Sequence, residues 1–229
     1  MPTNLALLTV VKFPEPGKVK TRLAAEIGDE LAAEVYCHFI AQTFARVKSL
    51  TEATPFVAFT PEEKATEFQR MFPGGQRWFA QINSSNFGVR LRHAVQAVLQ
   101  QDYQRVITIG SDSPTLPPAY LKEAAEALSA HDLVLGPAED GGYYLIGLKS
   151  APAGLFEGIT WSTEKVLQQT LAAAQRLGLR VHLLPEWYDV DDLPALHRFC
   201  LTSDVPHDLA ARLKPFLLRE LVDYHKMIA

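Results

Sequence analysis

The sequence has few cysteines and no long apolar run, and these absences exclude several classes of protein. Its 229 residues include only Cys37 and Cys200, too few for a structural zinc site or a disulfide framework. No stretch approaches the roughly 18 consecutive apolar residues of a membrane span. The N-terminus lacks the positive region and cleavage site of a signal peptide. We therefore expect a cytoplasmic protein with reduced thiols and no membrane span.

Other signatures are missing as well. No G-x-G-x-x-G follows an apolar run, which argues against a dinucleotide-dependent dehydrogenase. No G-x-S-x-G is present and the seven histidines are scattered, which argues against a Ser-His-Asp hydrolase. The formal net charge of −4 gives no basic footprint for nucleic acid. The length fits one domain over residues 1–229 that buries an ordinary core.

Short apolar runs alternate with amphipathic stretches along the chain. The expected strands are 5–11, 54–60, 105–110, 132–138, 142–148 and 180–185, with 77–82 as a weaker candidate. The expected helices are 22–49, 61–71, 87–101, 117–130, 162–177, 192–202 and a last one from Pro206 onward, with a candidate break at Pro215. This alternation predicts an α/β fold with a mostly parallel sheet between helices. The Asp-Gly-Gly turn before 142–148 predicts an antiparallel excursion.

A cluster of cations follows the first expected strand, in "VKFPEPGKVKTRLA". Turns and helix starts present backbone N–H groups that bind anions, and cations beside them neutralise phosphates. The residues that we expect to bind phosphates here are Lys12, Pro16, Gly17, Lys18, Lys20 and Arg22. The loop is not a Walker A motif, because Val19 follows the Gly-Lys pair. A surface turn with solvated lysines is an equally good interpretation of the loop alone.

Carboxylates follow later strands. Asp112 directly follows the strand at 105–110, where it could bind Mg²⁺ or Mn²⁺, or only help to cap the next helix. In "WYDVDD", alternation places Asp189 and Asp191 on the same side of an extended segment. Asp192 is the better N-cap for the helix that follows, which leaves Asp189 or Asp191 free for a metal. Asp140 lies in a turn that the glycines alone would favour.

Five motifs occur in order: "KFPEPGKVKTRLA", "GSDSPTLP", "EDGGYYLIGL", "ITWSTEKVLQQT" and "YDVDDL". Together they resemble the bacterial family of nucleotide-diphospho-sugar transferases with the GT-A fold, which is similar to the 2-phospho-L-lactate guanylyltransferases. The resemblance covers about residues 5–200. It implies a single-domain three-layer α/β/α sandwich with a mostly parallel mixed sheet.

The resemblance also implies roles for individual residues. Candidate catalytic residues are Asp112, Asp140 and Lys20. Beyond the basic loop, Ser111, Gly88 and Arg90 are expected to bind the nucleotide, Gly141, Gly142, Trp161 and Ser162 the substrate, and Asp112 and Asp191 the metal. Two positions depart from the family pattern: Val89 replaces a glutamate and Asp192 replaces a threonine.

The leading hypothesis is therefore a metal-dependent nucleotide-diphospho-sugar transferase that uses Mg²⁺ or Mn²⁺ and a small-molecule acceptor. Sugar transferases of this fold usually carry D-x-D after the central strand, whereas this chain has "SDS". The single acid favours the alternative, a guanylyltransferase-like nucleotidyltransferase that uses a nucleoside triphosphate and releases pyrophosphate. A non-catalytic nucleotide-binding protein is a second alternative. The base, the acceptor and a homodimer are left open.

Overall fold

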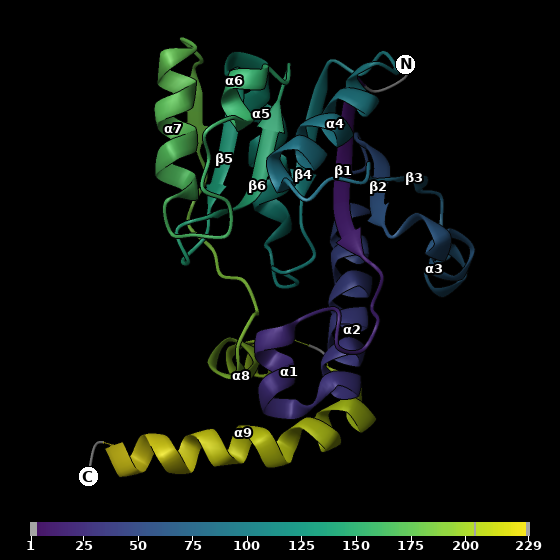
Figure 1. Ribbon diagram of the computed structural model, residues 1–229, viewed down its shortest axis with the longest axis vertical. Coiled ribbons are helices and arrows are strands. Elements are labelled where there is room, and N and C mark those ends of the chain that lie inside the picture. Colours follow the sequence, from purple (N-terminus) through teal and green to yellow (C-terminus); the bar gives the residue numbers. More distant parts are fainter. Residues whose placement is uncertain (1–3, 204, 228–229) are drawn as a thin grey trace.

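A seven-stranded mixed sheet forms the centre of the computed structural model, which describes residues 4–203 and 205–227, with side chains up to residue 218 (Figure 1). Its strand order is β3-β2-β1-β4-β6-β5-β7. The strands are β1 (Leu5–Lys12), β2 (Thr54–Thr60), β3 (Arg77–Ala80), β4 (Arg105–Ile109), β5 (Leu133–Pro137), β6 (Tyr143–Leu148) and β7 (Val181–Leu183). Among the described strands, β6 alone runs antiparallel to its neighbours, which confirms the predicted excursion.

The helices lie close to the expected ranges. They are α1 (Thr21–Ile27), α2 (Asp29–Val47), α3 (Ala65–Met71), α4 (Phe87–Leu99), α5 (Pro118–Ala130), α6 (Ala153–Phe156), α7 (Val166–Arg176), α8 (Leu193–Thr202) and α9 (His207–Met227). A 3₁₀ turn, η1 (Glu62–Lys64), precedes α3. The single helix expected over 22–49 was wrong, because Gly28 adopts a φ of 89° and separates α1 from α2. The candidate break at Pro215 does not occur, and α9 continues through this exposed residue.

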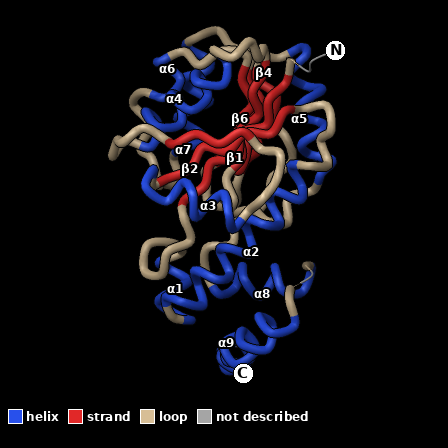
Figure 2. Tube along the Cα trace, turned by 90° about the vertical axis from the view of Figure 1, so that its right-hand side faces the viewer, coloured by secondary structure: helices blue, strands red, loops and turns tan. Residues whose placement is uncertain are grey.

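Alternate residues of the strands face two helical layers. Ala6 and Leu8 of β1 belong to the core beneath α4, α6 and α7, whereas Leu5 and Leu7 belong to the core beneath α5 and the end of α2. Figure 2 shows helices on both sides of the strands. The three-layer arrangement is therefore confirmed.

A third core lies at the carboxyl end of β1. Val11 and Phe59, near the carboxyl ends of β1 and β2, belong to the same buried cluster as residues of α1, α2, α8 and α9. In Figure 1 these helices extend beyond the tip of the β1 arrow. The chain thus builds a floor of helices at the sheet edge where open α/β sheets bind ligands.

None of the described helices is both long enough and apolar enough to cross a membrane.

Candidate active site

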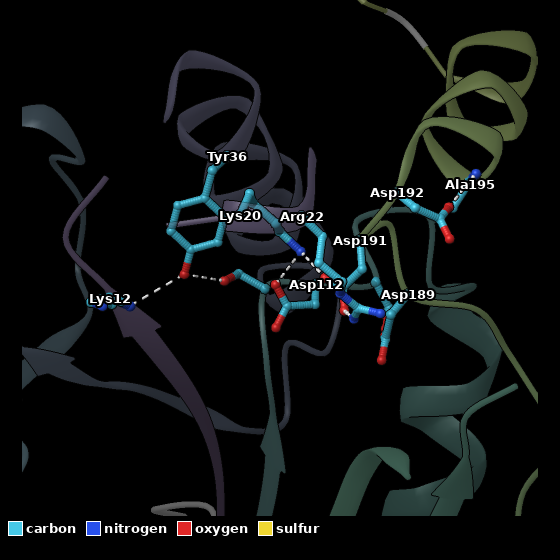
Figure 3. A network of polar contacts seen from close by, with 11 residues as sticks. Lys12, Lys20, Arg22, Tyr36, Asp112, Asp189, Asp191, Asp192 and Ala195 are labelled. Carbon is cyan, nitrogen blue, oxygen red and sulfur yellow. Dashed lines mark hydrogen bonds and ion pairs between the residues drawn. The ribbon is translucent and has the colours of Figure 1, made fainter. Parts of the chain in front are cut away.

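The buried ammonium of Lys20 joins two acids from distant parts of the chain. Its Nζ lies 2.5 Å from Oδ1 of Asp112, just after β4, and 2.8 Å from Oδ1 of Asp191, just before α8. Arg22 completes the group, with Nη2 at 2.6 Å from Oδ2 of Asp191 (Figure 3). The backbone holds the two acidic segments together, because the N–H of Val190 donates to the carbonyl of Asp112 at 2.7 Å. The basic loop and both predicted acidic positions therefore meet at one place.

Lys20 is held inside by its backbone and by aromatic rings. It precedes α1 in the left-handed conformation (φ 46°, ψ 46°), which costs a residue with a side chain free energy. Its side chain is only 3% exposed, and Nζ lies 5.5 Å from the Phe39 ring centre and 5.8 Å from that of Tyr36. Burial opposes the charged form, but the carboxylates of Asp112 and Asp191 outweigh burial and raise the pKa of Lys20. Lys20 is therefore a fixed positive charge.

Tyr36 of α2 connects the basic loop to the segment that carries Asp112. Its hydroxyl accepts hydrogen bonds from the backbone N–H of Lys12 at 3.2 Å and from Oγ of Ser111 at 2.9 Å. Burial, with the nearby charge of Asp112, raises the pKa of Tyr36 to about 12. The phenol therefore stays neutral. Ser111 is buried and bonded to this phenol, so the structure places it behind the site that it was predicted to line.

Asp189 differs electrostatically from its neighbour Asp191. One of its oxygens accepts a hydrogen bond from Ser113. Burial raises its pKa to about 7; the Ser113 bond opposes this, and the charges of Asp112, Asp140 and Asp191 add to it. Burial also acts on Asp191, yet Lys20 and Arg22 lower its pKa. The acid without a cation beside it thus titrates near neutrality, whereas Asp191 stays ionised.

Three adjoining hollows form one cleft around these residues. A hollow of about 340 Å³ is lined by the basic loop and Tyr36, and it shares Asp112 with an apolar cavity of about 170 Å³. A third, of about 410 Å³, shares Arg22 and Asp191 with the first and Asp189 with the apolar cavity. We name them the basic hollow, the apolar cavity and the acidic hollow. Arg22 and Asp112 therefore line the same hollow.

The basic hollow receives most of the predicted cations. Lys12, Lys18, Lys20 and Arg22 all line it. Nζ of Lys12 donates to the carbonyl of Lys18 at 2.7 Å, which draws the loop together. Gly17, with a φ of 73°, lies in the turn between Lys12 and Lys18 but does not line the hollow, and neither does Pro16. These two residues shape the loop.

Two further residues that were predicted to bind the nucleotide also lie outside the cleft linings. A Cβ on Gly88 would come within 2.6 Å of the Trp161 indole nitrogen, so this glycine permits packing against Trp161. The guanidinium of Arg90 donates to the carbonyl of Ser84 at 2.6 Å and lies over the Phe87 ring. The structure gives these residues contacts that hold the start of α4, and it is Phe87 and Leu91 of this helix that line the apolar cavity.

The residues that were predicted on the substrate side also lie partly inside and partly outside the cleft. Asp140 lines the acidic hollow, and its Oδ1 accepts the N–H of Gly142 at 2.8 Å. Gly141 has a φ of 86°, and a Cβ there would collide with the backbone of Glu164. Trp161 packs against Phe87 and Tyr143, and Ser162 lies in an exposed turn; neither lines the cleft. Of these five predicted residues, only Asp140 reaches the described hollows.

Some cleft residues were not predicted. Arg198 of α8 donates to both carboxylate oxygens of Glu139, at 2.9 and 3.2 Å, and lies 3.7 Å from the Tyr188 ring centre. All three line the acidic hollow. Glu139 and Tyr188 are the first residues of the quoted motifs "EDGGYYLIGL" and "YDVDDL", so their place in the sequence was a usable signal for them. Arg198 and Tyr36 lie inside helices, and no local pattern distinguishes them from packing residues.

The predicted metal ligands do not fit a divalent ion in this arrangement. Among the described side chains, no group of three or more His, Cys, Asp or Glu is placed to hold one. Lys20 lies between Asp112 and Asp191, and both oxygens of Asp191 already accept from cations. The two acids are therefore compensated by the chain's own charges.

Comparison with known proteins agrees with this architecture. Residues 43–163, more than half of the chain, match the family described as "Uncharacterized protein conserved in bacteria (DUF2064)". The chain belongs to the DUF2064 family. This DUF2064 chain is also similar to a Desulfovibrio desulfuricans G20 protein named "putative nucleotide-diphospho-sugar transferase". The two are 31% identical over 95% of this chain and 98% of that one, with a TM-score of 0.86. The predicted resemblance to that transferase family is confirmed.

More distant structures share the fold alone. A Mycobacterium tuberculosis H37Rv protein solved with manganese is 13% identical over 85% of the DUF2064 chain and 97% of its own, with a TM-score of 0.53. A CMP:2-keto-3-deoxy-manno-octonic acid synthetase solved with CTP is 10% identical over 85% and 95%, with a TM-score of 0.55. None of the curated proteins matches the chain.

Proposed function

We propose that this DUF2064 chain is a transferase that takes a nucleotide donor and holds the donor's phosphates in the basic hollow. The observation that carries the proposal is the convergence of Lys12, Lys18, Lys20 and Arg22 with Asp112 on one hollow. Charge grows on the leaving phosphate during transfer, and fixed cations stabilise that charge. The named activities of the Desulfovibrio relative and of the CTP-bound synthetase support the same class of reaction.

Among donors, the geometry favours a nucleoside triphosphate. The acceptor oxygen would then attack the α-phosphorus, and pyrophosphate would leave with the electrons of the broken P–O bond. The segment after β4 supplies only one acid, and the serines on either side of Asp112 are bonded to Tyr36 and Asp189. This differs from the two-acid pattern of sugar transferases. Binding of Mg²⁺ or Mn²⁺ stays a prediction. Its proposed ligands Asp112 and Asp191 already pair with Lys20 and Arg22, so no step of the reaction is placed on the metal.

A nucleotide-diphospho-sugar donor is the second candidate. It is supported by the name of the 31% identical relative. The acceptor would attack the anomeric carbon, and the nucleoside diphosphate would leave into the same basic hollow.

Melting temperatures distinguish the two donors. Each nucleoside triphosphate, diphosphate and diphosphate-sugar is added separately, with Mg²⁺ or with EDTA. A ligand at about 100 times its Kd stabilises by roughly 2.7 kcal/mol. For a chain of this size that is a rise of about 5 to 10 °C. A rise with triphosphates alone supports nucleotidyl transfer, and a rise with diphosphate-sugars supports sugar transfer. No rise with any nucleotide would overturn the proposal.

A further inference from the structure

The two acids of the cleft already have a cation, and it belongs to the protein. Asp112 follows β4 and Asp191 precedes α8, and among the described residues the ammonium of Lys20 is the side-chain group that contacts both carboxylates, at 2.5 and 2.8 Å. Two carboxylates in so confined a place require a positive charge between them. A divalent ion and a lysine ammonium are two ways to supply it.

Several features fix Lys20 in this position. Its backbone adopts the left-handed conformation, and the first turn of α1 closes on it through the N–H of Ala24, 2.7 Å from the Lys20 carbonyl. Phe39 and Tyr36 contact the ammonium on its apolar side. The neighbouring Lys18 contrasts with it, because its side chain is 62% exposed and forms an ion pair with Glu15. Strained backbone that persists at a polar cleft indicates a side chain whose placement matters.

We propose that Lys20 is the resident counter-ion of Asp112 and Asp191, and that it excludes divalent metal ions from this pair in the free protein. A metal ion bound by both carboxylates would lie close to an ammonium whose side chain is only 3% exposed, and like charges at close range repel. Arg22 adds to the exclusion, because it holds the second oxygen of Asp191. The inference goes beyond the proposed function, since it concerns the protein without any nucleotide.

The substitution Lys20→Met tests this inference. Methionine keeps most of the side chain's length and removes its charge, which leaves Asp112 without its cation and Asp191 with Arg22 alone. We expect the variant to gain one Mn²⁺ site, with an affinity at least about tenfold higher than that of wild type. The measurement is electron paramagnetic resonance of Mn²⁺ added to nucleotide-free protein, in which bound ion loses the sharp signal of free ion.

Two controls accompany the titration. Lys18→Met removes a cation of the same loop that does not touch either acid, and we expect no gain in Mn²⁺ affinity. Lys20→Met combined with Asp112→Asn removes half of the new site, and the gain should disappear. Circular dichroism and melting curves establish that each variant is folded, and Lys20→Gln replaces Lys20→Met if the latter does not fold.

Wild-type protein provides the decisive result even if both Lys20 variants fail to fold. Absence of Mn²⁺ uptake by the nucleotide-free wild type supports the inference. Uptake of one Mn²⁺ per wild-type chain that Asp112→Asn abolishes would overturn it, as would a folded Lys20→Met or Lys20→Gln variant that takes up no Mn²⁺. Failure of every nucleotide to raise the melting temperature would contradict the proposed function and leave these metal titrations unaffected.

Discussion

Asp189 is an acid of the cleft, and none of the groups that shift its pKa is a cation. Its pKa rises to about 7 through burial, despite the Ser113 hydrogen bond, and the charges of Asp112, Asp140 and Asp191 add to the rise. An unfolded aspartate has a pKa of about 3.9. The folded protein therefore binds more protons than the unfolded chain between about pH 4 and 7, so this group lowers stability as the pH rises through that range.

We predict that Asp189→Asn is more stable than wild type at pH 8, by about 1 to 3 kcal/mol. The difference should shrink below pH 7 and vanish near pH 4, where the wild-type carboxyl is neutral in both states. Urea unfolding at a series of pH values measures this difference.

Asp132→Asn is the control with the opposite sign, because hydrogen bonds from Arg180 lower the pKa of Asp132 to about 2. That variant should be less stable than wild type above about pH 4, and the difference should disappear as the pH falls through 2. An Asp189→Asn difference that does not change with pH would contradict the account.

At this scale the sequence predicted the charged residues of the cleft better than their partners. From the order of cations after one strand and acids after others we expected Lys20, Arg22, Asp112 and Asp191 at one site, and the structure brings these four side chains together. Their pairing could not be predicted, because it depends on Lys20 turning inward through a left-handed backbone that a non-glycine residue rarely adopts. Tyr36 was missed because its hydroxyl reaches Ser111 across 75 residues of sequence.

At the scale of elements, the turn between β5 and β6 docks onto the start of α7. The carbonyl of Gly141 accepts the N–H of Leu167 at 2.9 Å, and Glu164 leaves no room for a Cβ. We predict that Gly141→Ala destabilises the protein by about 2 to 4 kcal/mol, because backbone strain and overpacking add. Gly178→Ala is the matched control. Its φ of 66° is similar, but nothing lies within 4 Å of a Cβ there, so the expected cost is about 1 kcal/mol. Equal losses in urea unfolding would contradict the docking role.

The start of α8 gives a second prediction at this scale. The side chain of Asp192 accepts the N–H of Ala195 at 2.9 Å, which confirms that this residue caps the helix. Asp192→Ala should lower stability by about 1 kcal/mol, whereas Asp192→Ser should change it little, because serine also caps helices well. Thermal unfolding measures both. A loss in Asp192→Ser as large as in Asp192→Ala would show that the carboxylate has a role besides capping.

Element types were predictable where periodicity and turn residues agreed. The antiparallel excursion of β6 was signalled by Asp-Gly-Gly, and the cap at Asp192 by the proline and apolar residues after it. The boundary at Gly28 was missed because the apolar pattern continues across it from α1 to α2. The four-residue helix α6 (Ala153–Phe156) is too short to show a period.

At the scale of the whole molecule, the helical floor joins the last helix to the cleft. Leu213 of α9 is fully buried in the core that contains Leu23 of α1 and Phe39 of α2. Leu213→Ala should therefore cost about 2 to 5 kcal/mol. Arg212→Ala removes an exposed ion pair with Glu34 and should cost no more than about 1 kcal/mol. Denaturant unfolding compares the two. Similar losses would contradict the packing of α9 against the cleft's supporting helices.

The topology was predictable at this scale because parallel strands bring their carboxyl ends to one edge of a sheet. That rule alone placed the basic loop, Asp112 and the acidic segment near one another. The helical floor of α1, α2, α8 and α9 could not be predicted, since it depends on contacts between the two ends of the chain.

Pyrophosphate binding, measured by isothermal titration calorimetry, tests the central claim most directly. Wild type should bind it, and Arg22→Gln should bind at least about tenfold more weakly, because one cation of the basic hollow is lost. Arg180→Gln is the matched control, since Arg180 precedes β7 at the opposite end of the strands and pairs with Asp132. We predict wild-type affinity for this control. No pyrophosphate binding by wild type, or an equal loss in both variants, would contradict a phosphate site between the basic loop and Asp112.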